Sequence, residues 1–446
     1  MFKIASILIP AYILLLPFQR LGLPVHRYFF APADIVFVLG FLLFLPRLVK
    51  SVAARQEVLR KDFLRFGVFY GIFFAAVLFS LLVSKHPMAG LVDLLPFVYA
   101  AGMIVLFGMV FTGENPGLEK WLQHSLALAL GMISLATFVP ASIFPGWSRL
   151  IFEGTAFPKY VFFTNNPNQL SVLVLVYFGI FLLLRSEGRV RSRLYDILLP
   201  VLFMNAVLWS GSRIAFMSGL VLLSIFGWVL FREIFDRAPG GRWAKTAVFG
   251  CSLALVLLVS YYHLGATRNW TAYRSVSGVQ AIAVKLFPPG RGSRAEKFSP
   301  HEAVVTAFGV RREINSLAVK CFFEHPVTGV GLGQFKGNYH HYEVHNSVLG
   351  IAAETGILGL FGLSLWLGYL FFAGFRWAFA FRGRLVVLAG VLIAVLVPHW
   401  FHYLLRERWV WFFFCFLLYL SGSSTGKTAG KVPAGPGMGT AVPAGK

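Results

Sequence analysis

Apolar runs long enough to cross a lipid bilayer recur along almost the whole chain, and they constrain its fold more than any other feature. Crossing the hydrocarbon core takes about 20 consecutive apolar residues in a helix. Hydrophobic residues make up 57% of the chain and charged residues only 13%, against about 25% charged residues in an average soluble domain. So few charges cannot cover a folded surface that faces water on every side. The sequence therefore predicts an all-α polytopic membrane protein.

The lengths of the apolar runs predict about twelve transmembrane helices. The predicted spans cover residues 4–18, 32–46, 66–83, 91–111, 121–143, 168–184, 195–209, 214–231, 246–263, 347–373, 385–404 and 409–421. The first span contains Pro10 and Pro17 and lacks a small-x-small cleavage site, so we interpret it as a membrane helix rather than a cleaved signal peptide. The seventh and eighth spans are short and nearly continuous.

The Lys and Arg residues gather in alternate connections between the spans, as membrane orientation requires. The richest connections are those around 47–65, 185–193, 232–245 and 376–384. Because cytoplasmic loops carry the excess of Lys and Arg, we expect a multi-pass membrane protein with both termini in the cytoplasm; if the host is a Gram-negative bacterium, the membrane is the inner membrane. The net charge of +22 is thereby explained without a nucleic-acid partner.

The predicted spans divide the chain into four regions. Spans one to nine occupy residues 1–263, a large loop covers 264–346, spans ten to twelve occupy 347–421, and 422–446 form a tail whose composition predicts disorder. The orientation places the large loop outside, in the periplasm if the host is a Gram-negative bacterium, and loops of this length are usually functional. Its excess of Lys and Arg favours an anionic ligand, or alternatively attraction to anionic lipid headgroups.

Within the large loop, residues 311–325 have the periodicity of an amphipathic helix. Its apolar face carries Ile314, Leu317, Ala318, Cys321 and Phe322. Pro326 is expected to end the helix. Arg311 shares the apolar face, whereas Arg312 lies toward the other flank. We therefore expect this helix to cover the membrane domain and to direct Arg311 into the space between them.

A glycine-rich loop and a histidine follow this helix. The loop reads Pro-Val-Thr-Gly-Val-Gly-Leu-Gly at 326–333, and His345-Asn346 stand at the start of the tenth span. A helix N-terminus suits phosphate, and an imidazole there exchanges a proton near neutral pH. The alternative is an interfacial histidine that only caps the helix. Glu354 falls on the opposite side of a regular helix from His345, so we expect a structural, hydrogen-bonded or protonated role for it.

Other polar residues mark the expected outer ends of the spans. Arg213 follows a short turn, where it either contacts a ligand or anchors at headgroups. Asn166 and Asn168 open the sixth span, and either serve as helix punctuation or touch substrate. A further cluster, with interface anchoring as its alternative, comprises His399, His402, Arg406 and Arg408. Neither a disulfide framework nor a zinc site is indicated by the Cys and His spacing.

Taken in order, these pieces resemble the O-antigen ligase/polymerase family of bacterial envelope glycosyltransferases. They are Asn-Pro-Asn at 166–168, Ser-Gly-Ser-Arg at 210–213, an Arg ahead of Pro-x-x-Gly-x-Gly at 326–331, His-Asn at 345–346 and Glu-x-Gly-x-x-Gly-Leu at 354–360. The resemblance spans roughly residues 160–375. It implies a GT-C-type membrane enzyme that moves a glycan from undecaprenyl diphosphate to an acceptor hydroxyl at the outer face, with no metal or cofactor.

The resemblance also implies roles for individual residues. Arg213 and one of Arg311 and Arg312 would hold the donor diphosphate, since preorganised guanidinium groups stabilise the charge on that leaving group. His345 would act at the acceptor hydroxyl or at the leaving phosphate. Candidate substrate contacts are Asn346, Asn166 and Asn168.

Two family activities remain open at this point. A ligase would use lipid A–core as acceptor and a polymerase another glycan repeat unit, and both need a lipid diphosphate donor. A lipid-linked oligosaccharide transporter is the alternative from another class. Transporters place ionisable residues near the membrane midplane and often show inverted repeats. Here no repeat is evident and the polar groups gather on one side, which favours the enzyme.

Overall fold

The computed structural model describes residues 2–25, 28–53, 61–112, 118–138, 152–153, 159–164, 166–189, 192–235, 250, 300–340, 343–379, 384–401 and 405–423. Nearly all of these residues are helical. The strands among them form two short antiparallel hairpins, β1 (Leu23–Val25) with β2 (Tyr28–Phe30) and β3 (Phe152–Glu153) with β4 (Lys159–Tyr160).

Every predicted span except the ninth coincides in large part with a described helix. These helices are α1 (Phe2–Leu15), α2 (Pro32–Ala53), α3 (Lys61–Leu82), α4 (Pro87–Thr112), α5 (Leu118–Leu135), α7 (Pro167–Ser186), α8 (Arg193–Ser210), α9 (Arg213–Phe235), α13 (Ser347–Phe379), α14 (Arg384–Phe401) and α15 (Arg408–Ser423). Seven are long and apolar enough to cross a bilayer, and α14 and α15 contain shorter apolar stretches. The predicted class, an all-α polytopic membrane protein, is confirmed. The ninth span, residues 264–299 of the large loop, and the tail from 424 lie outside the described residues.

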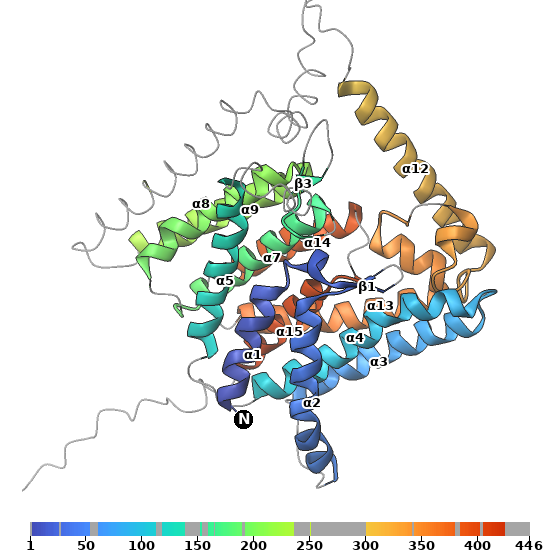
Figure 1. Ribbon diagram of the computed structural model, residues 1–446, viewed down its shortest axis with the longest axis horizontal. Helices are drawn as coiled ribbons and strands as arrows, with labels where there is room; N and C mark the ends of the chain where they lie inside the picture. Colours follow the sequence, from blue (N-terminus) through green and yellow to red (C-terminus); the bar gives the residue numbers. More distant parts are fainter. Residues whose placement is uncertain are drawn as a thin grey trace, which may run out of the picture.

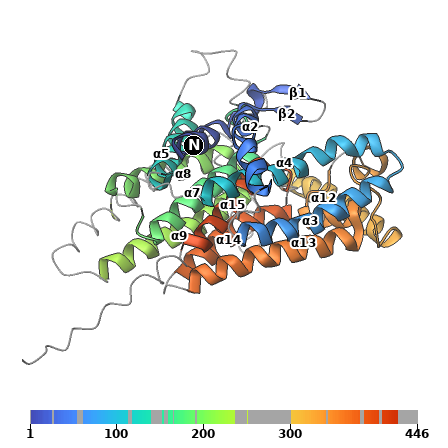
Figure 2. The same cartoon turned by 90° about the horizontal axis from the view of Figure 1, so that it is seen from below.

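Helix α7 forms the centre of the bundle (Figure 1). Every residue from Leu170 to Arg185 is buried, so this helix is covered on all sides by its neighbours. It packs against α8, α9 and α14. A second group of helices extends to one side, where α3 runs along α13 (Figure 2).

Ion pairs connect the ends of neighbouring helices. Arg185 at the end of α7 binds Asp196 in the first turn of α8 at 2.8 Å and Glu233 near the end of α9 at 2.5 Å. Arg376 near the end of α13 binds Asp62 at the start of α3 at 2.8 Å. Alternating passage through a membrane predicts that these ends share one side, as the Lys and Arg distribution did. Which side is cytoplasmic stays a prediction.

Helix α13 is interrupted at Gly356, where φ is 63° and ψ is −156°. The predicted tenth span is therefore interrupted at this residue. The first section ends at Thr355, and the longer section that follows runs along α3. Apolar residues stand on both sides of the break, so the hydrophobic pattern gave no sign of it.

The loop helix α12 (Pro300–Glu324) is longer than the predicted 311–325. The missed signal is Pro300, because proline is favoured at the first position of a helix. The predicted inward face is confirmed: Ile314, Ala318 and Cys321 are all at most 1% exposed. They pack with Phe335, Val344 and Ala353 in a cluster separate from the main core, which fastens α12 over the first section of α13 (Figure 1).

Candidate functional site

The glycine-rich loop fills the break in α13. At the break, the carbonyls of Ala353 and Glu354 accept hydrogen bonds from the loop N–H groups of Val330 at 2.8 Å and Gly331 at 3.1 Å. In the other direction, the N–H groups of Ile357 and Leu358 donate to the carbonyls of Pro326 and Val327, at 2.8 and 3.4 Å. The loop thus supplies the backbone partners that the interrupted helix lacks, which apolar surroundings require.

Two glycines make this junction possible. Gly329 and Gly356 both have positive φ, at 67° and 63°, which other residues rarely adopt. A Cβ on Gly329 would overlap the backbone of Glu354, and one on Gly356 would overlap the carbonyl of Val327. The glycine pattern therefore sets how closely the end of α12 approaches the membrane domain.

This junction brings α12 close to His345. The Arg311 guanidinium is partly buried and near enough to act on the imidazole, whereas the neighbouring Arg312 is exposed. The predicted difference between the two arginines, made from helical periodicity, agrees with this placement.

The surroundings of His345 favour its neutral form. Burial of the half-buried ring and the Arg311 charge hold the pKa of His345 below its ordinary value of 6.5, with a further contribution from His340, and Glu343 acts in the opposite direction. A neutral imidazole at neutral pH is able to accept a proton.

The N-terminus of α13 is already capped. Asn346 is buried, and its Oδ1 accepts hydrogen bonds from the N–H groups of Val348 at 2.9 Å and Leu349 at 3.0 Å. The expectation that this helix end offers its N–H groups to a phosphate is weakened accordingly, because Asn346 takes two of them. The positive charge in this region comes instead from side chains such as Arg311.

The other candidate residues are placed in part. Asn166 caps α7 through its Oδ1, which accepts from the Gln169 N–H at 2.9 Å, and the Asn168 carbonyl accepts from Ser171. The Asn166 side chain therefore caps the helix, while substrate contact by Asn168 stays a prediction. Arg213 opens α9 two residues after the left-handed Gly211, while its side chain, like that of His399, lies outside the described atoms. His402 lies outside the described residues.

Sequence reasoning named Arg406 only as part of a polar cluster and missed its carboxylate partners. The Arg406 guanidinium binds Asp93 of α4 at 3.1 Å, Glu354 at 3.3 Å and Glu343 at 3.7 Å. Glu354 is therefore hydrogen-bonded, as predicted, with Arg406 as its partner. An acidic residue within an apolar span signals such a partner, and Asp93 was that signal. These carboxylates surround an arginine, and no group of His, Cys, Asp or Glu suited to a metal ion occurs in the described part of the chain.

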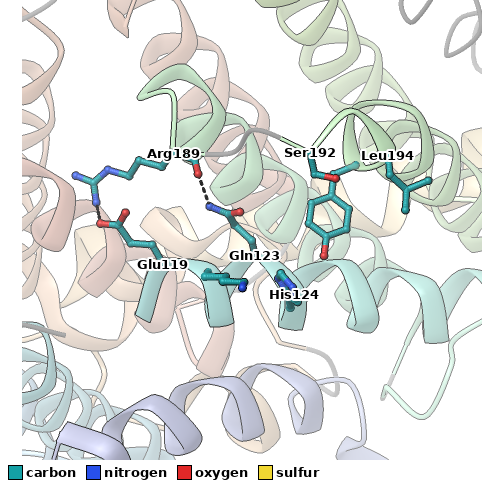
Figure 3. Close-up of a pocket in the computed structure, with 8 residues that line it drawn as sticks. Glu119, Gln123, His124, Arg189, Ser192 and Leu194 are labelled. Atoms are coloured by element: carbon teal, nitrogen blue, oxygen red, sulfur yellow. Dashed lines mark hydrogen bonds and ion pairs between the residues drawn. The ribbon is translucent and has the colours of Figure 1, made fainter. Parts of the chain in front are cut away.

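A pocket of about 470 Å³ lies at the helix ends opposite to those near His345 (Figure 3). It is formed by the first turns of α5 and α8 and by Arg189. Glu119 and Glu187 bind the guanidinium of Arg189. The backbone carbonyl of Arg189 accepts a hydrogen bond from the Gln123 side chain at 3.0 Å. Because its arginine is already neutralised by carboxylates, this pocket is a weaker candidate for a diphosphate than the region around Arg311.

A comparison with known families matches the region that contains the site residues. Residues 197–364 match the family model described as O-antigen ligase. No curated protein matches the chain significantly. The matched residues contain Arg213, α12, the glycine-rich loop and His345, and they exclude Arg406. The match supports an O-antigen ligase-like family for this chain, and with it a membrane glycosyltransferase of the ligase/polymerase type.

Proposed function

We propose that the protein transfers a glycan from undecaprenyl diphosphate to a hydroxyl of lipid A–core at the periplasmic face of the inner membrane. The observation that carries this proposal is the junction of the glycine-rich loop with α13, since it brings Arg311 and His345 together. The family match supports a membrane glycosyltransferase of the O-antigen ligase/polymerase type.

In the proposed reaction, the acceptor hydroxyl oxygen attacks the anomeric carbon of the lipid-linked glycan. The bond between that carbon and the phosphate oxygen breaks, and undecaprenyl diphosphate leaves with the electron pair. His345 accepts the hydroxyl proton, which its lowered pKa permits at neutral pH. Arg311 and Arg213 stabilise the charge that develops on the diphosphate. No metal is required, because the guanidinium groups serve the same electrostatic purpose.

The orientation of the protein follows from the same proposal. The Arg311–His345 end faces the periplasm, where acceptor and donor meet, and both termini lie in the cytoplasm. The ion-paired ends around Arg185 and Arg376 then lie on the cytoplasmic side, in agreement with the positive-inside rule.

The adjacent arginines supply a matched test of this proposal. Arg311→Lys should abolish transfer, since a lysine cannot make the bidentate phosphate contact, while the exposed Arg312→Lys should transfer normally. Both variants are expressed in a strain that lacks the native gene, and polysaccharide linked to lipid A–core is measured together with the amount of membrane-inserted protein. The opposite result would assign the diphosphate to Arg312.

The same strain distinguishes ligation from polymerisation. Loss of the protein should remove polysaccharide from lipid A–core while long glycans remain on the lipid carrier. If attachment persists but only single repeat units are attached, the protein is a polymerase and the proposed acceptor is wrong.

A further inference from the structure

Arg406 lies in the connection between α14 and α15, with only 9% of its side chain exposed. Its three carboxylate partners come from separate places: Asp93 from α4, Glu343 from the segment before α13, and Glu354 from the end of the first section of α13. Burying several acidic groups is costly unless a cation compensates them. The planar guanidinium, with its five N–H donors, is suited to serve several acceptors at once.

Two of these partners stand on either side of His345. Glu343 precedes the histidine by two positions, and Glu354 closes the short helical section that begins just after it. Asp93, which is 1% exposed, ties the same guanidinium to α4. Arg406 thus binds both ends of the segment that carries His345, and it also binds α4.

The space around Arg406 excludes a substrate. A cavity of about 10 Å³ lies between Lys336, Glu343, Glu354 and Arg406, which is room for about one water molecule. Neither a diphosphate nor a sugar fits there. The role of Arg406 is therefore exerted through the residues that it holds.

We propose that Arg406 is a positioning residue that fixes the Glu343–His345 segment against α4 and α13, on the condition that His345 performs the transfer described above. A second cation contributes at Glu343, because Lys336 binds the same carboxylate at 3.1 Å. The charged and titratable groups that act on His345 are Arg311 of α12 and Glu343 and His340 of the preceding segment, and those that face Glu343 are Lys336 and Arg406.

Arg406→Lys tests the geometry, because it keeps the charge and loses the multiple contacts. We expect kcat to fall by about a hundredfold, the effect of a displacement of about 1 Å at a reacting group, while the KM for the lipid-linked donor is unchanged. Arg408→Lys is the matched control. Arg408 binds Asp34 of α2 at 2.6 Å, so this variant should keep its kcat per folded protein.

The charge of the cluster supplies a readout that simple loss of stability would not produce. Glu343→Gln removes the negative charge that raises the pKa of His345 and should lower that pKa, whereas Arg406→Gln leaves the Glu343 charge less compensated and should raise it. Arg406→Lys should leave it unchanged. The pKa is measured from the pH dependence of His345 modification by diethyl pyrocarbonate, read by peptide mass spectrometry, which requires no turnover.

The outcomes separate the proposal from its alternatives. Wild-type kcat in Arg406→Lys, or an equal loss in Arg408→Lys, would overturn the positioning role. So would His345 modification curves that do not shift in Glu343→Gln and Arg406→Gln. If those curves shift as expected but the wild-type protein transfers no glycan, the coupling of Arg406 to His345 is supported and the proposed reaction fails.

Discussion

Replacing Gly356 with alanine should detach α12 from the membrane domain. The residue adopts φ 63° and ψ −156°, a conformation that is nearly exclusive to glycine and costs other residues about 1–3 kcal/mol. The new Cβ would also overlap the Val327 carbonyl and lie 2.7 Å from the Gly329 nitrogen. Because both neighbours are backbone atoms, the loop must move away.

Movement of the loop strains the hydrogen bonds that join it to α13, each of which contributes about 1 kcal/mol. With the backbone strain, the docking of α12 should lose at least about 3 kcal/mol, which corresponds to a change of about a hundredfold in the population of the undocked state.

Cys321 reports this change directly. This residue of α12 is fully buried, and burial raises the pKa of its thiol to about 11. It should therefore react slowly with a maleimide in the wild-type protein. In Gly356→Ala, we expect Cys321 to be labelled about a hundred times faster, as measured by peptide mass spectrometry on detergent-solubilised protein.

Gly368→Ala is the matched control on the same helix. A Cβ at this position meets nothing within 4 Å, and alanine is the better helix former by about 1 kcal/mol. Its labelling rate should equal that of the wild type. Equal rates in Gly356→Ala and Gly368→Ala would refute the reasoning, because the break in α13 would then not depend on glycine.

Three further predictions concern single residues. Transfer should decline as pH falls through the pKa of His345, because protonation removes the base, with a midpoint below the ordinary 6.5; a pH–rate profile with a midpoint above that value would contradict it. Arg185→Ala should lower the free energy of unfolding in mixed micelles by about 3–5 kcal/mol, since it leaves two acidic groups uncompensated. Asn346→Ala should lower the free energy of unfolding by about 1 kcal/mol and Asn346→Ser by much less, because serine also caps helices. If Asn346→Ser restores stability but not activity, Asn346 touches substrate.

Local pattern predicted the helices and the inward face of α12. Periodicity placed Ile314, Ala318 and Cys321 on one face and distinguished Arg311 from Arg312, because helix geometry depends only on neighbouring residues. The break at Gly356 was not predictable in this way. Glycine is common in membrane helices, and the apolar run continues on both sides. What the break requires is a loop that arrives from another part of the chain.

The Arg406 cluster shows the same limit at the site. In the sequence, Asp93 is hundreds of residues from Arg406, and Glu343 and Glu354 are tens of residues from it. No periodicity relates these positions. Only the presence of Asp93 in an apolar span indicated that a buried cation was needed. The partner became evident from the packing of α4 against α15 and of α15 against α13.

Transfer by the purified protein tests the central claim most directly. Wild-type protein in detergent is mixed with undecaprenyl diphosphate-linked glycan and lipid A–core, without a membrane gradient, and the glycosylated product is quantified beside folded His345→Ala protein. We predict product from the wild type and none from the variant. Product formed by His345→Ala at the wild-type rate would contradict the assignment of His345, and absence of product from the wild type would contradict the proposed reaction.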